Sequence, residues 1–262
     1  MHYLSEYVTI YWKCEAENVQ PSRLDDSAKK VIKHIENVLL EREMEYMENS
    51  AVVNRTGPLC PVDSAIRVPP LGYRMVKRAF DLIAALILSV LLAVPAAILM
   101  LLIRLDSPGP AIFRQERLGK NGKPFLILKL RSMRLDAEKN GPRWAERNDS
   151  RCTRLGSFLR RSRLDELPQL WNILRGDMSF VGPRPERAYF YDQFEKTIPG
   201  FRNRLAVVPG LTGLAQVNGG YDLSPGQKIV FDMKYIENCC VGMDLSCMLK
   251  TVRLVFTHEG AR

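Results

Sequence analysis

Two adjacent carboxylates, Asp165 and Glu166, lie in the arginine-rich stretch RRSRLDELPQL. Four arginines lie close to the pair in the sequence: Arg154, Arg160, Arg161 and Arg163. Nearby arginine favours the ionised form of a carboxyl group. An ionised carboxylate can serve as a nucleophile or as a magnesium ligand. Acidic residues are also common at solvated helix starts, where they offset the helix dipole, so the pair alone leaves both interpretations open.

A second candidate is the segment Gly182-Pro-Arg-Pro185, which is followed by Glu186 and Arg187. The two prolines restrict the backbone on both sides of Arg184, and the planar guanidinium with its five donors suits phosphate recognition. A rigid turn that carries an exposed arginine would have the same sequence.

Other charged residues could complete such a site. Lys129 and Arg131 alternate along a predicted strand, so both side chains lie on one face. Asp177, directly after Gly176, is a candidate second metal ligand or a turn residue. Cation pairs of this kind are often solvated surface. Together, however, the acids suit a nucleophile and a metal ion, and the cations suit a diphosphate, which is the chemistry of phosphoryl transfer.

The elements that position these residues include an uncharged segment of 22 residues, Leu82–Ile103. A bilayer core requires about 20 apolar residues, and a soluble core helix is rarely apolar on every face. Pro95 lies just past the middle and predicts a bend. Basic residues flank both ends: Arg74, Lys77, Arg78, Arg104, Arg114, Arg117, Lys120 and Lys123. The positive-inside rule then favours a re-entrant helix with both ends in the cytoplasm, although a kinked spanning helix also fits.

The charge divides the chain into regions with different roles. Residues 1–73 carry 8 Lys and Arg against 11 Asp and Glu, whereas residues 74–262 carry 30 against 18. We predict an N-terminal extension with a linker (1–73), a membrane helix (74–106) and a catalytic domain (107–262). Within the extension, residues 25–49 have the pattern of an amphipathic helix suited to a homodimer contact or a partner, and residues 50–72 read as a linker.

The predicted fold of the later part is α/β and rich in helix. Short strands are expected at Ala111–Phe113 and Pro124–Leu130, joined by a turn at Gly119–Gly122. Helices are expected over residues 153–163, 165–174, 185–197, 225–238 and 243–257, with Gly176 closing the second. Residues 199–220 read as a loop. The six cysteines form no C-x-x-C pair and are interpreted as reduced thiols.

Over residues 74–258 the sequence resembles the bacterial sugar transferase family, the small monotopic phosphoglycosyl transferases. The motifs that carry the resemblance occur in order: KRAFDLI, SPGPAIFRQERLGKNGKPF, LKLRSM, RRSRLDELPQLWNILRGDMSFVGPRPE, PGLTGLAQVNG and MDLSCMLKT. The resemblance implies a single re-entrant membrane helix, broken near Pro95, and a catalytic domain on the cytoplasmic face of the inner membrane.

The resemblance also implies a reaction. Asp165 would attack the sugar-linked phosphorus of a UDP-sugar and release UMP, and polyprenyl (undecaprenyl) phosphate would then take the phosphosugar from the aspartate. Glu166 would bind or position Mg²⁺, to which Asp165 would also be a ligand. The basic residues that would contact the phosphates are Lys129, Arg131, Arg160, Arg184 and Arg187. The step would begin the synthesis of an exopolysaccharide, capsule, O-antigen or glycoconjugate, from a sugar that the sequence does not specify.

Two rival functions remain for comparison. A non-catalytic, membrane-anchored basic module would bind acidic lipid or nucleic acid, but it does not explain Asp165 and Glu166. The basic clusters also lack the aromatic platform that single-stranded nucleic acid requires, so no nucleic acid partner is expected. A multi-span phosphosugar transferase without a covalent intermediate would need several apolar segments, and one is found.

Overall fold

The computed structural model describes residues 69–137, 139 and 149–257. The chain divides into two compact units, Met1–Val52 and Val53–Arg262. The first unit, which includes the predicted helix at 25–49, lies outside the described residues, as does most of the predicted linker. All that follows concerns the second unit.

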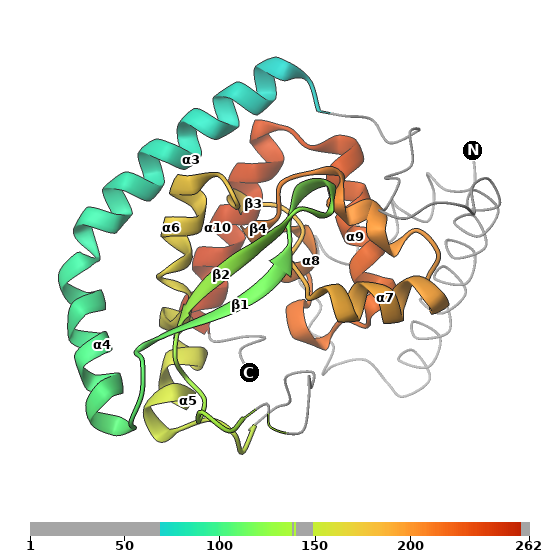
Figure 1. The fold of residues 1–262 in the computed structure, drawn as a ribbon. Helices are drawn as coiled ribbons and strands as arrows, with labels where there is room; N and C mark the ends of the chain where they lie inside the picture. The colour runs from blue at the N-terminus through green and yellow to red at the C-terminus, as the bar shows by residue number, and fades with distance from the viewer. Residues whose placement is uncertain (1–68, 138, 140–148, 258–262) are drawn as a thin grey trace, which may run out of the picture. The chain divides into compact units, whose positions relative to one another are not determined.

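Two consecutive helices, α3 (Leu71–Leu91) and α4 (Ala93–Asp106), contain the apolar segment. They meet at Leu92 with a bend of 60° and run as a bent arc past α6 and α5 (Figure 1). Pro95 explains the bend, because it has no N–H for the carbonyl of Leu91, four residues earlier. In the described part of the chain no single helix is long and apolar enough to cross a bilayer, and only this bent pair meets that criterion jointly.

The predicted hairpin is confirmed. Strand β1 (Ile112–Leu118) pairs antiparallel with β2 (Pro124–Leu130), and the register runs from Ile112 opposite Leu130 to Leu118 opposite Pro124. The first strand is longer than the predicted Ala111–Phe113. The connecting turn, η2 (Lys120–Gly122), places Asn121 in the left-handed region with φ of 56°, which asparagine tolerates better than most residues.

The predicted helix over 165–174 is wrong at its beginning. The chain forms α5 (Arg154–Arg161), then a short 3₁₀ turn η3 (Leu164–Glu166), and only then α6 (Gln169–Arg175). Pro168 caps α6, and a proline is tolerated at a helix start but not inside one. Gly176 ends α6 with φ of 89°, as predicted. The two carboxylates therefore lie in a tight turn between helices.

The remaining elements include a second pair of strands, which is parallel and was not predicted from the sequence. Strand β3 (Ser179–Val181) pairs with β4 (Gly210–Thr212), which lies in the segment read as a loop. The other elements are α7 (Ala188–Thr197), η4 (Phe201–Ala206), α8 (Leu214–Val217), η5 (Gly220–Asp222), α9 (Pro225–Asn238) and α10 (Val241–Thr257). Both predicted C-terminal helices are present.

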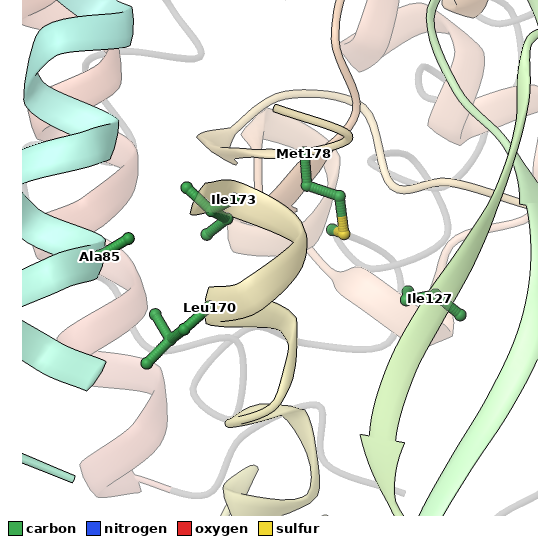
Figure 2. Close-up of a cluster of buried hydrophobic side chains, with 5 residues drawn as sticks. All are labelled: Ala85, Ile127, Leu170, Ile173 and Met178. Atoms are coloured by element: carbon green, nitrogen blue, oxygen red, sulfur yellow. The ribbon is translucent and has the colours of Figure 1, made fainter. Parts of the chain in front are cut away.

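The core joins the bent helices to the hairpin through α6. Ala85 on α3 packs with Leu170 and Ile173 on α6, and the cluster continues through Met178, just after α6, to Ile127 on β2 (Figure 2). A second cluster joins Ile103 of α4 to Ala111, Leu130 and Leu159, and Leu164 packs against it. Since Leu164 directly precedes Asp165, this cluster anchors the turn that carries the carboxylates.

Candidate active site

Glu166 brings together three segments that are far apart in the sequence. Its Oε1 atom lies 3.1 Å from Nζ of Lys129 on β2. The same oxygen also accepts a hydrogen bond from Nη2 of Arg184, in the loop after β3. Strand β2, turn η3 and the Gly182–Pro185 loop are thus held together by one carboxylate between two cations. The structure therefore unites the acidic pair with two of the predicted phosphate-binding residues.

The backbone before the pair determines where Asp165 points. Arg163 adopts a left-handed conformation, with φ of 56°, between α5 and η3. Leu164 then packs into the core, and Asp165 is left 6% exposed. A non-glycine residue in this conformation is uncommon and stores strain, so the turn depends on the packing around it.

Asp165 lines a cavity of about 440 Å³. Among the residues that the structure describes, one other acidic residue, Glu186, lines it, whereas the basic residues are eight: Arg117, Lys129, Arg131, Arg134, Arg151, Arg160, Arg184 and Arg187. A concave site lined by one sign of charge concentrates ligands of the opposite sign. The cavity is therefore suited to a polyanion such as a diphosphate.

The two carboxyl groups have opposite pKa shifts. Burial raises the pKa of Asp165 to about 6, the charge of Glu166 adds to this, and Lys129 is the strongest opposing charge. Burial also disfavours ionisation of Glu166, but Arg184 and Lys129 outweigh it and hold the pKa of Glu166 well below its usual range. Glu166 is thus held ionised by Lys129 and Arg184 rather than by the arginines next to it in the sequence, whereas for Asp165 burial outweighs the cations.

The backbone of Arg184 is held by a buried ion pair between Arg204 and Asp232. Arg204 donates from Nη2 to the carbonyl oxygen of Arg184 at 2.9 Å. Its Nε lies 2.6 Å from Oδ2 of Asp232, and both side chains are 1% exposed. The Arg204 guanidinium also lies 4.8 Å from the centre of the Phe201 ring. The sequence reading missed Arg204 and Asp232, which no motif links.

Glycines allow the loop of Arg184 to pack directly on the loop around β4. The N–H of Gly182 bonds to the carbonyl of Thr212, and the N–H of Gly210 bonds to that of Pro183. A Cβ atom on Gly210 would lie 2.1 Å from the nitrogen of Gly182, and one on Gly213 would lie 2.2 Å from the oxygen of Gly182. Only glycine permits so close a backbone approach.

Arg117 holds the following residues to the hairpin. Its Nη1 donates to the carbonyl oxygen of Pro185 at 3.1 Å and lies 2.9 Å from Oε2 of Glu186. The backbone of Glu186 accepts from the N–H of Leu118 at 3.0 Å. Arg187 follows as the residue that caps α7 and lines the cavity. Glu186 thus has a structural role next to the site.

Three further candidates from the sequence have partners of their own within the protein. Arg131, 6% exposed, donates to the carbonyl oxygens of Ile103, Ser107 and Pro108, so it holds the end of α4. Arg160 lines the cavity and donates to Sγ of Cys152 at 3.1 Å. Asp177 pairs with Arg175 at 3.4 Å and does not line the cavity.

The residues present fit a magnesium ion that arrives with a substrate. Mg²⁺ in phosphoryl-transfer sites is bound by one or two carboxylates together with substrate phosphates, and Asp165 and Glu166 supply that number. Among the described residues no group of three or more His, Cys, Asp or Glu could form a complete cage.

Gln169, one turn after Glu166, is fully buried, and its side-chain amide has no hydrogen-bond partner in the described part of the chain.

The amino-acid sequence is similar to those of known bacterial transferases over most of the described residues. Residues 72–258 match the family model described as bacterial sugar transferase. The chain is 42% identical over 198 residues to the UDP-N-acetylgalactosamine-undecaprenyl-phosphate N-acetylgalactosaminephosphotransferase of Aeromonas hydrophila, which covers 74% of this chain and 47% of that protein. It is 43% identical over 202 residues to the UDP-glucose:undecaprenyl-phosphate glucose-1-phosphate transferase of Caulobacter vibrioides, covering 74% of each.

A third relative, from Bacillus subtilis, carries the provisional name undecaprenyl-phosphate N-acetylgalactosaminyl 1-phosphate transferase. It is 55% identical over 134 residues, which is 51% of this chain and 74% of that protein. The chain thus spans less than half of the Aeromonas protein and about three quarters of the other two.

Proposed function

Because the chain belongs to the bacterial sugar transferase family, we propose that it transfers a sugar 1-phosphate from a UDP-sugar to polyprenyl phosphate. The observation that carries the proposal is Asp165, a buried carboxylate that lines a cavity with eight basic side chains. The names of the relatives support the same donor and acceptor classes.

In the proposed reaction, the cations of the cavity bind the diphosphate of the donor and orient it. An oxygen of Asp165 attacks the sugar-linked phosphorus, the bond from that phosphorus to the bridging oxygen breaks, and UMP leaves with the electron pair. An oxygen of polyprenyl phosphate then attacks the same phosphorus, and the carboxylate of Asp165 is released. Such reactions depend on positioning and charge neutralisation, which Lys129 and Arg184 provide.

Glu166 acts in this scheme as a fixed anion that positions the two cations, because Arg184 and Lys129 hold its pKa well below its usual range. Mg²⁺, held by Asp165, Glu166 and the donor phosphates, would supply further neutralisation of charge. Asp165, with its pKa near 6, is mostly ionised at pH 7.5 and remains available as the nucleophile.

The acceptor would reach this cavity along α4. A groove of about 830 Å³ is lined by α4 residues such as Ala97 and Leu101 and shares Phe113, Arg131 and Leu135 with the catalytic cavity. Its lining is mostly apolar, which suits a polyprenyl chain whose phosphate points toward Asp165. The bent pair α3 and α4 would enter the cytoplasmic leaflet of the inner membrane and return, which leaves the catalytic domain on the cytoplasmic side.

UMP release tests the reaction. The full chain in detergent is incubated with Mg²⁺, polyprenyl phosphate and a panel of UDP-sugars that begins with UDP-N-acetylgalactosamine and UDP-glucose. Wild type should release UMP and form a lipid-linked sugar phosphate with one donor, whereas Asp165→Asn should be inactive. Asp192→Asn is the matched control, because Asp192 is exposed on α7 and pairs with Arg202.

The covalent step has its own readout. A radiolabelled donor sugar should remain on the wild-type protein when acceptor is omitted, and Asp165→Asn should carry no label. Activity of Asp165→Asn equal to wild type would exclude Asp165 as the nucleophile. Absence of UMP release with every donor would favour the non-catalytic membrane module.

A further inference from the structure

A second cavity, of about 570 Å³, lies where the first turns of α3 meet the hairpin tip and the residues after η4. Lys120 contributes from the hairpin, Ala206 from the end of η4, and Val207 and Val208 from the segment after it. None of its lining residues also lines the catalytic cavity. It is therefore a separate site, to which the proposed reaction assigns no role.

Four basic residues of the described part of the chain line this cavity, and two of them are engaged within the protein. Lys77 forms an ion pair with Asp244 at 2.8 Å. Arg78 donates to the carbonyl oxygens of Ile173 and Leu174 at the end of α6, at 2.6 and 2.8 Å. These two side chains hold α3 to the rest of the unit and are not available to a ligand.

Arg74 and Lys120 are different. In the part of the chain that the structure describes, neither side chain forms an ion pair or a hydrogen bond. Both line the same cavity, and burial, and then the charge of Arg74, lowers the pKa of Lys120. Asp81, the one acidic residue in the lining among the residues that the structure describes, accepts a hydrogen bond from the N–H of Phe180. Two cations that line one cavity repel each other, and a bound anion would relieve this repulsion.

The remaining lining identifies the kind of anion. Leu71 and Met75, 67% and 65% exposed, line the cavity next to Arg74. They belong to the helix that we propose enters the membrane. An apolar surface beside a pair of cations at the start of such a helix matches a phosphate ester with an acyl chain, and basic residues near the membrane surface attract anionic lipid.

We propose that this cavity binds one anionic phospholipid, with its headgroup phosphate between Arg74 and Lys120 and an acyl chain along Leu71 and Met75. The inference rests on the proposed membrane insertion of α3 and is independent of the proposed reaction. The bound lipid would fix the depth at which α3 enters the bilayer.

Calorimetric titration of the full chain in dodecyl maltoside tests the proposal. The probes are dihexanoyl-phosphatidylglycerol, dihexanoyl-phosphatidylcholine and inorganic phosphate. Wild type should bind the anionic lipid at least tenfold more tightly than either of the others. Lys120→Gln should weaken binding about fivefold, and Arg74→Gln with Lys120→Gln about 25-fold, given the usual contribution of a basic residue near anionic lipid.

Lys123→Gln is the matched control, because Lys123 is exposed in the same hairpin and does not line the cavity; it should bind as wild type does. The unfolding midpoint without lipid shows that each variant is folded. Equal affinity for the two lipids, or wild-type affinity in the double variant, would overturn the proposal. Tight binding of inorganic phosphate that depends on Lys120 would instead indicate a site for a free anion.

Discussion

Arg204 donates a hydrogen bond to the carbonyl oxygen of Arg184 at 2.9 Å, so a fully buried guanidinium supports the loop from which the cavity arginine extends. The support is itself fixed by Asp232, in the middle of α9. The position of Arg184 therefore depends on a residue that contacts neither the cavity nor Glu166.

Arg204→Met should destabilise the protein by about 3–5 kcal/mol, because it leaves Asp232 buried without its partner. Adding Asp232→Leu should restore most of the stability, since an apolar pair of similar volume replaces the ion pair. The double variant should still release UMP at least tenfold more slowly, because the carbonyl of Arg184 has lost its donor. Thermal unfolding and UMP release measure the two effects, and full activity in the folded double variant would exclude the positioning role.

Asp165→Asn should stabilise the protein while it abolishes activity. The folded-state pKa of Asp165, about 6, lies above its ordinary value of 3.8. The ionised carboxylate therefore destabilises the fold above pH 6, by about 2–3 kcal/mol at 1.36 kcal/mol for each pKa unit. This cost declines as the pH falls through the folded-state pKa of about 6, and it is fully lost only below the ordinary value of 3.8, where the carboxyl group is protonated in both states. Unfolding midpoints at pH 7.5 and pH 4.5 should show a gain for the variant that is large at the first and small at the second.

The same pKa predicts the pH dependence of the reaction. For wild type, kcat/KM for UMP release should fall as the pH drops below about 6, because protonation of Asp165 would remove the proposed nucleophile. Glu166 should contribute no inflection in this range, since its pKa is held far lower. A profile that is flat between pH 5 and 8 would contradict the assignment of Asp165.

Arg131 distinguishes a structural from a substrate-binding cation. It donates to three carbonyl oxygens at the end of α4, so Arg131→Met should lower stability by about 1–3 kcal/mol, the cost of unsatisfied buried groups. Arg131→Lys should restore little, because an ammonium group cannot reproduce the planar fork. If Arg131 instead binds donor phosphate, KM for the UDP-sugar should rise at unchanged stability. Lys129→Met provides the comparison for a cation that faces Glu166.

The groove along α4 can be tested by filling it. Ala97→Phe should raise KM for polyprenyl phosphate about tenfold, on the scale of 1–3 kcal/mol for overpacking, and should leave donor-dependent labelling of Asp165 unchanged. Ala93→Phe is the control, because Ala93 is exposed on the same helix and does not line the groove. An equal effect of both substitutions would show a general perturbation of α4.

Thiol labelling decides between the re-entrant and the spanning arrangement. In a variant with the native cysteines replaced by serine, Met75→Cys and Leu105→Cys introduce probes at the exposed ends of α3 and α4. Both should react with a membrane-impermeant maleimide from the cytoplasmic side alone, in inverted vesicles and not in intact cells. Reaction of one of them from the outer side would show that the pair spans the membrane.

Local signals were sufficient for the hairpin, for the end of α6 at Gly176 and for the bend before Pro95, because each depends on a few neighbouring residues. They failed at Asp165, since its burial is determined by Leu164 packing on residues from α4, β2 and α5. They also failed for β3 and β4, because three-residue strands carry no periodicity. Arg204 and Asp232 show the same limit: a buried ion pair between residues 28 positions apart exists only after the chain has folded.

The backbone contact of Gly182 with Gly210 and Gly213 also limits how donor specificity can be redesigned. These positions accept no side chain. In a library of variants that randomises them, most members would therefore fail to fold, and few would gain a new sugar preference. Variation is better directed to lining positions with side chains of moderate size, such as Gln115, Ser132 and Met133. The three glycines are then kept unchanged, and variants of the lining residues are screened for other sugar preferences.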